Sequence, residues 1–255
     1  MKHLPNLLTL ANLFCGCIAI SFVLSAQNFT TSFNIDEYIE VPAIEQPYWG
    51  SVFIFLAAVF DMLDGWAARG LKIFSPIGKD LDSLADLVSF GVAPSMILFK
   101  MLWSAYMLRP EAMDVSMLAM SPAFLVACFG ALRLARYNVS VAEQNVSFSG
   151  MPIPAAGILI ATFPLIQWQN PLGIGLKLYN ATVLYAVIAV VCWLMVSKVR
   201  FFKFLPSKFS VADIWPQLVI IVVAAASFPF LQSAAITLAL ILYILLSFVY
   251  KPKQA

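Results

Sequence analysis

The sequence predicts an all-α fold, a polytopic transmembrane helical bundle, and three observations support this. Of the 255 residues, 62% are apolar and only 11% are charged, whereas soluble domains average about 45–50% apolar and about 25% charged residues. The apolar residues are gathered in long runs, and a helix that crosses a bilayer needs about 20 of them. A soluble domain of this composition would lack polar residues for its surface, and a disordered chain would carry more charge.

Apolar runs bounded by polar residues predict about eight spans, in order along the chain. Their approximate bounds are 6–26, 49–69, 77–104, 115–137, 151–169, 179–198, 213–229 and 231–250. The first run could also be a signal peptide, but it is long enough to span and we expect it to be retained. We expect one membrane-embedded domain over 1–255, with a core at 1–200 and an extra helical hairpin at 210–250.

Prolines divide several of these runs. Ser75-Pro76 predicts a cap and first turn for the third span, because proline is favoured at the first helical position. Pro94 lies inside the third span and is expected to bend it. Pro152 and Pro154 are expected to bend the fifth span near its start.

The basic residues predict the orientation, because cytoplasmic loops are enriched in Lys and Arg. Twelve of the 15 basic residues fall on one side of the predicted spans: Lys2, Arg69, Lys72, Lys79, Arg133, Arg136, Lys198, Arg200, Lys203, Lys208, Lys251 and Lys253. Both termini are therefore predicted to be cytoplasmic, in a plasma (inner) membrane. The net charge is only +2, so no nucleic-acid partner is expected.

The sequence lacks the residues for a zinc site or a histidine-based catalytic site. His3 is the single histidine, and the four cysteines form no CxxC pair. Zinc sites and Ser-His or Cys-His catalysis depend on these residue types.

Four aspartates lie near the ends of two neighbouring spans: Asp61 and Asp64 in the second, Asp82 and Asp86 in the third. A carboxylate within a span costs about 2.5–3.5 kcal/mol on insertion scales, so such acids usually have a function. Spacings of three and four residues place each pair on one helix face. Two adjacent antiparallel helices would thus present four carboxylates to each other.

This arrangement predicts a metal and diphosphate site. Four close carboxylates repel unless cations lie between them, and oxygen-only ligands select Mg²⁺, Mn²⁺ or Ca²⁺. Gly65 and Ala68 leave the helix face bare, and Arg69 can bind phosphate. Two such metals would suit in-line displacement at phosphorus. An ion-conducting acidic pathway, or hydrogen bonding between helices, remains an alternative at this point.

The full spacing resembles the motif of the CDP-alcohol phosphotransferase family at every position. It reads Asp61-x-x-Asp64-Gly65-x-x-Ala68-Arg69, eight residues, then Gly78-x-x-x-Asp82-x-x-x-Asp86. The resemblance implies a homodimeric membrane enzyme that moves a substituted phosphoryl group from a CDP-linked donor to an alcohol and releases CMP. It also implies roles for the residues: metal ligands at Asp61, Asp64, Asp82 and Asp86, with Asp86 also as the base, and CDP contacts from Gly65, Ala68, Arg69 and Gly78.

Further segments resemble the branch of that family that uses serine: 5–9, 12–16, 82–94, 131–138 and 148–156. This implies transfer of the phosphatidyl group of CDP-diacylglycerol to the hydroxyl of L-serine, giving phosphatidylserine and CMP. Arg133 and Arg136, with Asn138 beyond them, could hold the serine carboxylate, but could equally contact lipid phosphates. Two alternatives stay open: another acceptor (glycerol 3-phosphate or inositol phosphate), and a divalent-cation transporter.

Overall fold

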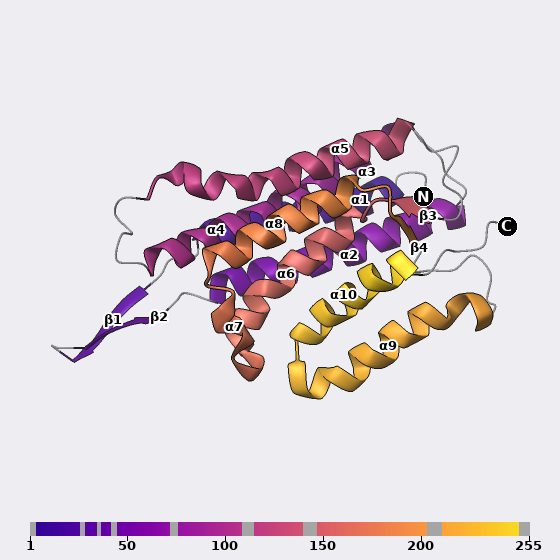
Figure 1. Cartoon of the computed structure of the whole chain (residues 1–255). Helices are drawn as coiled ribbons and strands as arrows, with labels where there is room; N and C mark the ends of the chain where they lie inside the picture. Colours follow the sequence, from indigo (N-terminus) through magenta and orange to yellow (C-terminus); the bar gives the residue numbers. More distant parts are fainter. Residues whose placement is uncertain are drawn as a thin grey trace.

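The computed structural model describes residues 4–25, 29–34, 37–41, 45–71, 76–108, 115–139, 147–202 and 211–249. These residues form a bundle of helices with two short pairs of strands (Figure 1). The predicted all-α class is therefore confirmed. Predictions that concern Lys2, Lys72 or Ser75 lie outside the described residues.

The helices follow the predicted apolar runs closely. They are α1 (Leu4–Ser25), α2 (Glu45–Leu71), α3 (Pro76–Asp86), the π-helical segment η1 (Leu87–Val92), α4 (Ala93–Met107), the 3-10 segment η3 (Met117–Phe124), α5 (Leu125–Val139), α6 (Ile153–Gln169), the 3-10 turn η5 (Pro171–Gly173), α7 (Ile174–Lys177), α8 (Ala181–Val196), α9 (Val211–Leu231) and α10 (Ala234–Val249). The last two form the predicted hairpin, which lies against α6 (Figure 1).

Within the described ranges, four helices are long and apolar enough to cross a membrane: Leu4–Ser25, Tyr48–Leu71, Ile77–Met107 and Met117–Val139. A fifth is added if Pro171–Lys177 and Ala181–Val196, which meet at 90°, count as one broken span. Three shorter apolar helices, α6, α9 and α10, accompany them. The long apolar helices are those of an integral membrane protein, and the count of eight spans stays a prediction.

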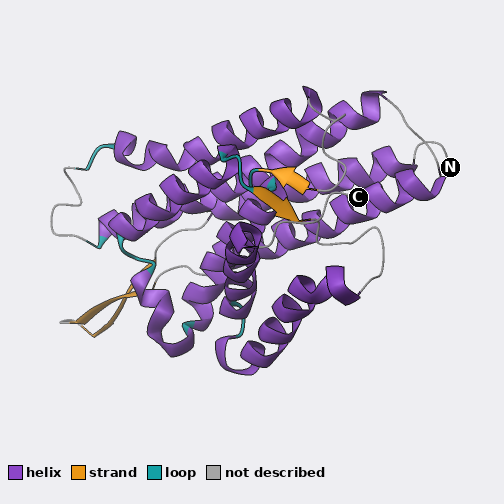
Figure 2. Ribbon diagram, turned by 45° about the vertical axis from the view of Figure 1, so that its right-hand side comes forward, coloured by secondary structure: helices purple, strands orange, loops and turns teal. Residues whose placement is uncertain are grey.

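Two antiparallel strand pairs mark opposite ends of the bundle (Figure 1). One is a hairpin of β1 (Phe29–Asn34) and β2 (Glu37–Val41) between α1 and α2. The other joins β3 (Ser147–Ser149), which precedes α6, to β4 (Arg200–Phe202), which follows α8. Figure 2 shows this second pair side by side in the helical body, so it ties two connections that are distant in sequence.

The helix formed by α3, η1 and α4 lies at the centre of the bundle and is the most buried of the long helices. Phe90, Leu98 and Leu102 are fully buried along it. Neighbouring helices approach closely where they have glycine. A Cβ at Gly16 of α1 would lie 2.9 Å from Ser89 Cα, and one at Gly157 of α6 would lie 2.8 Å from Phe90 Cα. The central helix is thus fixed on two sides near its aspartates.

The prolines act differently from one another. Before Pro94 the helix changes to π geometry, and the Ala93 amide donates to the Val88 carbonyl. Pro94 has no N–H and its ring would crowd the carbonyl four residues earlier, so the wider turn is a way to accommodate it. The bend expected at Pro152 and Pro154 was wrong, because Pro152 caps α6 and Pro154 lies in its first turn. Proline fits there because those N–H groups have no helical partner.

Candidate active site

Three of the four predicted aspartates form one cluster. One carboxylate oxygen from each of Asp61, Asp64 and Asp82 lies within 4.8 Å of the others. Asp61 and Asp64 come from the last turns of α2 and Asp82 from α3. Helices α2 and α3 therefore bring the two halves of the sequence motif together, as the spacing predicted.

Asp86 lies beside this cluster, one helical turn from Asp82. Its side chain is 8% exposed, so it is more deeply buried than Asp82. Its carboxyl group is within hydrogen-bonding reach of the Asp61 carboxyl group. Two carboxylates in contact require a proton or a cation between them, because their charges repel. The site is therefore built to take up positive charge.

Helix α1 supplies two polar side chains that the sequence interpretation had not assigned to the site. Thr9 Oγ1 lies 2.8 Å from Asp64 Oδ2 and 3.0 Å from the Pro5 carbonyl oxygen, and it is the donor. Asn12 Nδ2 donates to Asp86 Oδ1 at 3.3 Å. Ser89 Oγ in turn donates to the Asn12 carbonyl at 3.0 Å. These bonds hold two of the aspartates in fixed orientations.

Thr9 and Asn12 could have been noticed in the sequence as polar residues that recur along one face of an apolar helix. Thr9, Asn12 and Gly16 recur at spacings of three and four residues, so they share a face of α1. That face is buried.

The small and basic residues of the motif lie along the same two helices. The guanidinium of Arg69 curls over Gly65, where a Cβ would meet its nitrogens at 3.5 Å and 3.6 Å. This places the Arg69 charge near Asp64. Ala68 and Gly78 are partly exposed on α2 and α3. Ala68 is one turn from Asp64 and Gly78 is one turn from Asp82, so neither place carries a bulky side chain.

The three residues expected at the acceptor site have different surroundings. Arg133 of α5 is 7% exposed and interacts electrostatically with Asp86. Arg136 is exposed at the end of the same helix. Asn138 Nδ2 donates to Ser83 Oγ at 2.8 Å, and its carbonyl accepts from Lys79 Nζ at 3.2 Å, so it links α5 to α3. Arg133 is thus the buried one of the three, and it has an electrostatic interaction with one of the aspartates.

The residues present fit a hard divalent cation. The cluster offers carboxylate oxygens alone, which is the ligand set of Mg²⁺, Mn²⁺ and Ca²⁺. The Asn12 Oδ1 atom is buried with no hydrogen-bond partner among the described residues. A buried oxygen acceptor beside four carboxylates is a further atom suited to positive charge.

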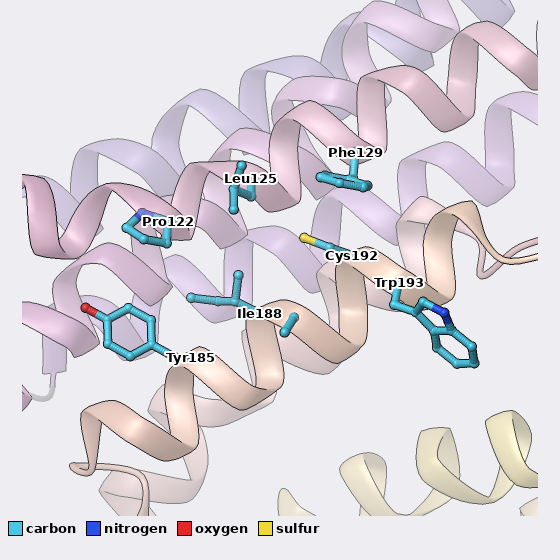
Figure 3. A pocket seen from close by; sticks show the side chains of 8 residues that line it. Pro122, Leu125, Phe129, Tyr185, Ile188, Cys192 and Trp193 are labelled. Atoms are coloured by element: carbon cyan, nitrogen blue, oxygen red, sulfur yellow. The ribbon is translucent and has the colours of Figure 1, made fainter.

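An apolar groove of about 460 Å³ lies elsewhere, between the η3–α5 segment and α8 (Figure 3). Pro122, Leu125 and Phe129 line one side of it, and Tyr185, Ile188 and Trp193 lie on the other. No charged side chain lines this groove, so we place the chemistry at the aspartates.

Comparison with known proteins agrees with this geometry. The family model of CDP-alcohol phosphatidyltransferase matches residues 2–197. A CDP-diacylglycerol–serine O-phosphatidyltransferase of Bacillus subtilis (strain 168) is 31% identical over 201 residues, covering 79% of this chain and 90% of that protein. An archaetidylserine synthase of Methanothermobacter thermautotrophicus is 30% identical over 183 residues, covering 71% of this chain and 66% of its own.

A third relative is a CDP-diacylglycerol–serine O-phosphatidyltransferase of Saccharomyces cerevisiae, 35% identical over 166 residues. There the match covers 62% of this chain and 52% of the relative. The chain thus spans most of the bacterial relative but only about half to two thirds of the other two.

Fold and site together define a class: a helical membrane enzyme with a cluster of carboxylates, suited to a hard cation, near the ends of two antiparallel helices. Within that class, the chain belongs to the CDP-alcohol phosphatidyltransferase family.

Proposed function

We propose that this protein transfers the phosphatidyl group of CDP-diacylglycerol to the hydroxyl of L-serine, giving phosphatidylserine and CMP. The observation that carries the proposal is the cluster of Asp61, Asp64 and Asp82 across α2 and α3, beside Asp86 and Arg133. The choice of serine is supported by the names of relatives at 31% and 35% identity, which are serine O-phosphatidyltransferases.

Asp61, Asp64 and Asp82, with Asp86 close by, would hold Mg²⁺ or Mn²⁺ on the diphosphate of the donor, with two ions as the expected number. Bound divalent cations supply charge stabilisation to the phosphoryl oxygens and the leaving phosphate. The Thr9 hydroxyl donates a hydrogen bond to the Asp64 carboxylate and so fixes its orientation. Arg69 lies where it can pair with a phosphate oxygen, and Gly65, Ala68 and Gly78 leave room for the cytidine part.

Asp86 is proposed as the base. It would accept the proton of the serine hydroxyl while that oxygen forms a bond to the β-phosphorus. The bond from this phosphorus to the bridging oxygen breaks, and CMP leaves with the electron pair. The hydrogen bond from Asn12 to Asp86 orients the carboxylate for this transfer.

Arg133 is proposed to bind the serine carboxylate. A guanidinium can make two parallel hydrogen bonds to a carboxylate. Acceptors with a phosphate dianion would require a denser basic pocket than the single arginine that lies beside Asp86. Arg136, three residues further along α5, and Asn138, which is bonded to Ser83 and Lys79 of α3, would assist there.

The tryptophans support a membrane position for the site. Trp49 and Trp66 are exposed near the two ends of α2, and a 17-residue separation corresponds to about 26 Å at about 1.5 Å per residue. This approaches the roughly 30 Å hydrocarbon thickness, and tryptophan favours both interfaces. Asp64 would then lie at one interface, which the basic residues make the cytoplasmic one.

The remaining proposals concern the whole chain. We propose about eight spans with both termini in the cytoplasm, in the plasma (inner) membrane, and a homodimer. The start of α1 and the end of α10 lie at the same end of the bundle (Figure 1), which supports the common side of the termini.

The test is CMP release by the purified protein in detergent with CDP-diacylglycerol and Mn²⁺ or Mg²⁺. L-serine, glycerol 3-phosphate, inositol phosphate and no acceptor are compared. Serine-dependent release that EDTA abolishes is the expected result. Release with another acceptor would keep the family and discard serine. No release with any acceptor from folded protein would overturn the proposal, and metal flux in liposomes would then be measured.

A further inference from the structure

The side-chain amide of Asn12 in α1 has one end bonded and one end without a partner. The residue is 0% exposed, and its Nδ2 atom donates to Asp86 Oδ1 at 3.3 Å. Its Oδ1 atom is buried and has no hydrogen-bond partner in the part of the chain that the structure describes. An unpaired buried acceptor is destabilising and requires an explanation. The mechanism proposed above uses only the nitrogen of this amide, so the oxygen has no role yet.

The orientation of the Asn12 amide is fixed by its surroundings. A carboxylate only accepts hydrogen bonds, so the amide nitrogen, and not the oxygen, must face Asp86. The main chain is held as well, because Ser89 Oγ donates to the Asn12 carbonyl at 3.0 Å. One turn further along α1, a Cβ at Gly16 would lie only 2.9 Å from Ser89 Cα, so the two helices are in contact there. Oδ1 is therefore a fixed acceptor on the same amide that contacts Asp86.

The missing donor is best supplied by the acceptor alcohol. Asp86 is the proposed base, so the group that enters beside it is the alcohol, whose hydroxyl proton goes to the Asp86 carboxylate. In L-serine the carbon next to the one that bears the hydroxyl carries an ammonium group. An ammonium group has three donors and no acceptor. A serine hydroxyl that faces Asp86 therefore brings a strong donor close to the Asn12 amide.

The charge of the site favours a neutral acceptor at this position. An ammonium group that leaves water needs hydrogen-bond acceptors, whereas the clustered carboxylates already repel one another. An amide oxygen supplies a hydrogen bond to the ammonium group without adding another negative charge beside Asp86. An asparagine thus suits this position better than a further acid.

We infer that Asn12 Oδ1 accepts a hydrogen bond from the ammonium group of the acceptor alcohol, so that Asn12 selects amino alcohols over other hydroxyl compounds. This inference rests on the proposed function and extends it, because it names the residue that distinguishes serine from an analogue without the amino group.

The test compares L-serine with 3-hydroxypropionate, which is serine without its amino group. In Asn12→Leu, which keeps the approximate shape and removes both polar atoms, the ratio of kcat/KM for serine to that for 3-hydroxypropionate should fall. The expected fall is about 10- to 100-fold, the size of one hydrogen bond to a charged donor. Loss of the hydrogen bond to Asp86 slows both reactions alike, so it cancels in this ratio.

Two matched variants should keep the ratio within about threefold of the wild-type value, because neither removes the acceptor atom. Asn12→Asp keeps an oxygen in the place of Oδ1 while it changes the contact with Asp86. Ser89→Ala removes the buried hydroxyl that donates to the Asn12 carbonyl and leaves the side-chain amide intact. A fall in Ser89→Ala as large as that in Asn12→Leu would overturn the inference.

Other roles for Asn12 would give different results. If Asn12 only orients Asp86, Asn12→Leu slows both acceptors by one factor and the ratio keeps its wild-type value. If Oδ1 binds the cation, the Mn²⁺ concentration for half-maximal activity rises while the ratio is unchanged. Either result would overturn the inference. Should Asn12→Leu fail to fold, Asn12→Ala carries the same expectation for the ratio.

The wild-type acceptor assay separates this inference from the proposed function. Use of glycerol 3-phosphate or inositol phosphate in place of serine would refute the choice of serine, and the inference with it. Use of serine, with a ratio that Asn12→Leu does not change, would refute the inference alone.

Discussion

The four aspartates are paired at helical spacings of three and four residues, but their surroundings differ. Asp64 and Asp86 are buried and receive hydrogen bonds from α1, whereas Asp61 and Asp82 are partly exposed. Asp80, two residues before Asp82, is exposed on α3 and lies outside the cluster. Buried and oriented carboxylates on one side, and accessible ones on the other, suit a site that must admit a charged diphosphate.

Asp82→Asn should lower CMP release by at least about a hundredfold, because the cluster loses one of its three anionic ligands. Asp80→Asn, with the same chemical change two residues away, should retain at least half of the wild-type rate. Steady-state CMP release at saturating Mn²⁺ measures both. Equal losses in the two variants would contradict the assignment of the cluster.

Thr9→Val tests the contribution of α1. Valine keeps the shape of threonine and removes the donor to Asp64. We expect the metal concentration for half-maximal activity to rise about tenfold, which is the effect typical of outer-shell residues.

Ser95→Ala is the control for Thr9→Val. It removes another buried hydroxyl, one bonded to the Gly91 carbonyl at 2.8 Å and away from the cluster. It should leave the metal titration unchanged. A shift of the same size in both variants would remove Thr9 from the site.

Residue spacing could predict the cluster because each half of the motif lies on a regular helix, α2 or α3, and the two helices are close in the sequence. Thr9 and Asn12 could not be assigned in the same way. Their partners are 55 and 74 residues away, and a helical face does not state which helix it meets. For a similar reason the sequence could not distinguish Arg133 from Arg136 as the residue nearer the aspartates. Side chains three residues apart on a helix differ in direction by only about 60° at about 3.6 residues per turn, and the spacing does not say which of them meets the neighbouring helix.

At the scale of the elements, long apolar runs predicted the described helices except η5 and α7, because burial or lipid contact dictates their composition. The strands were not predicted. β3 and β4 have three residues each and pair across the length of α6 and α8. Such segments are too short for an alternating pattern to appear. Their pairing depends on tertiary structure.

The close approach of α6 to the central helix gives a stability prediction. Gly157→Ala would place a Cβ 2.8–3.0 Å from Phe90 Cα, Cβ and carbonyl oxygen. Backbone cannot move aside cheaply, so we expect a destabilisation of about 1–3 kcal/mol. Thermal unfolding in detergent measures it.

Gly70→Ala is the matched control in a helix. A Cβ at Gly70 meets nothing within 4 Å, and alanine is favoured over glycine in helices by about 0.5–1 kcal/mol. The melting temperature should be equal or higher. A fall as large as that of Gly157→Ala would mean that the packing argument is wrong.

At the scale of the whole molecule, orientation can be checked with single cysteines in a background without the four native ones. Lys198 and Leu172 are both exposed, at opposite ends of α8 and its preceding turn. A membrane-impermeant maleimide should label Leu172→Cys in intact cells. It should label Lys198→Cys only after the membrane is opened. The reverse pattern would invert the proposed topology.

The number of spans shows what composition can and cannot establish. Eight apolar runs were predicted, and each has a helical counterpart. Yet α6 has 17 residues and α10 has 16, which is at and just below the lower limit of the roughly 17–25 needed. Tilt and neighbouring helices decide whether such segments cross, and hydropathy does not contain that information.

The π-helical segment Leu87–Val92 affects the direction in which the aspartates of the central helix face. It joins the half with Asp82 and Asp86 to the half that forms the core, so it sets the angle at which one half faces relative to the other. In a regular α-helix each residue turns the chain by about 100°. Deleting one residue here would restore an ordinary helix and keep every side chain of both halves. The aspartates would still face α2, because a π turn holds about one residue more than an α turn in one full rotation. The same deletion elsewhere in the central helix would turn them by about 100°, so this segment is the place where that helix can take up one residue of chain length without turning its site.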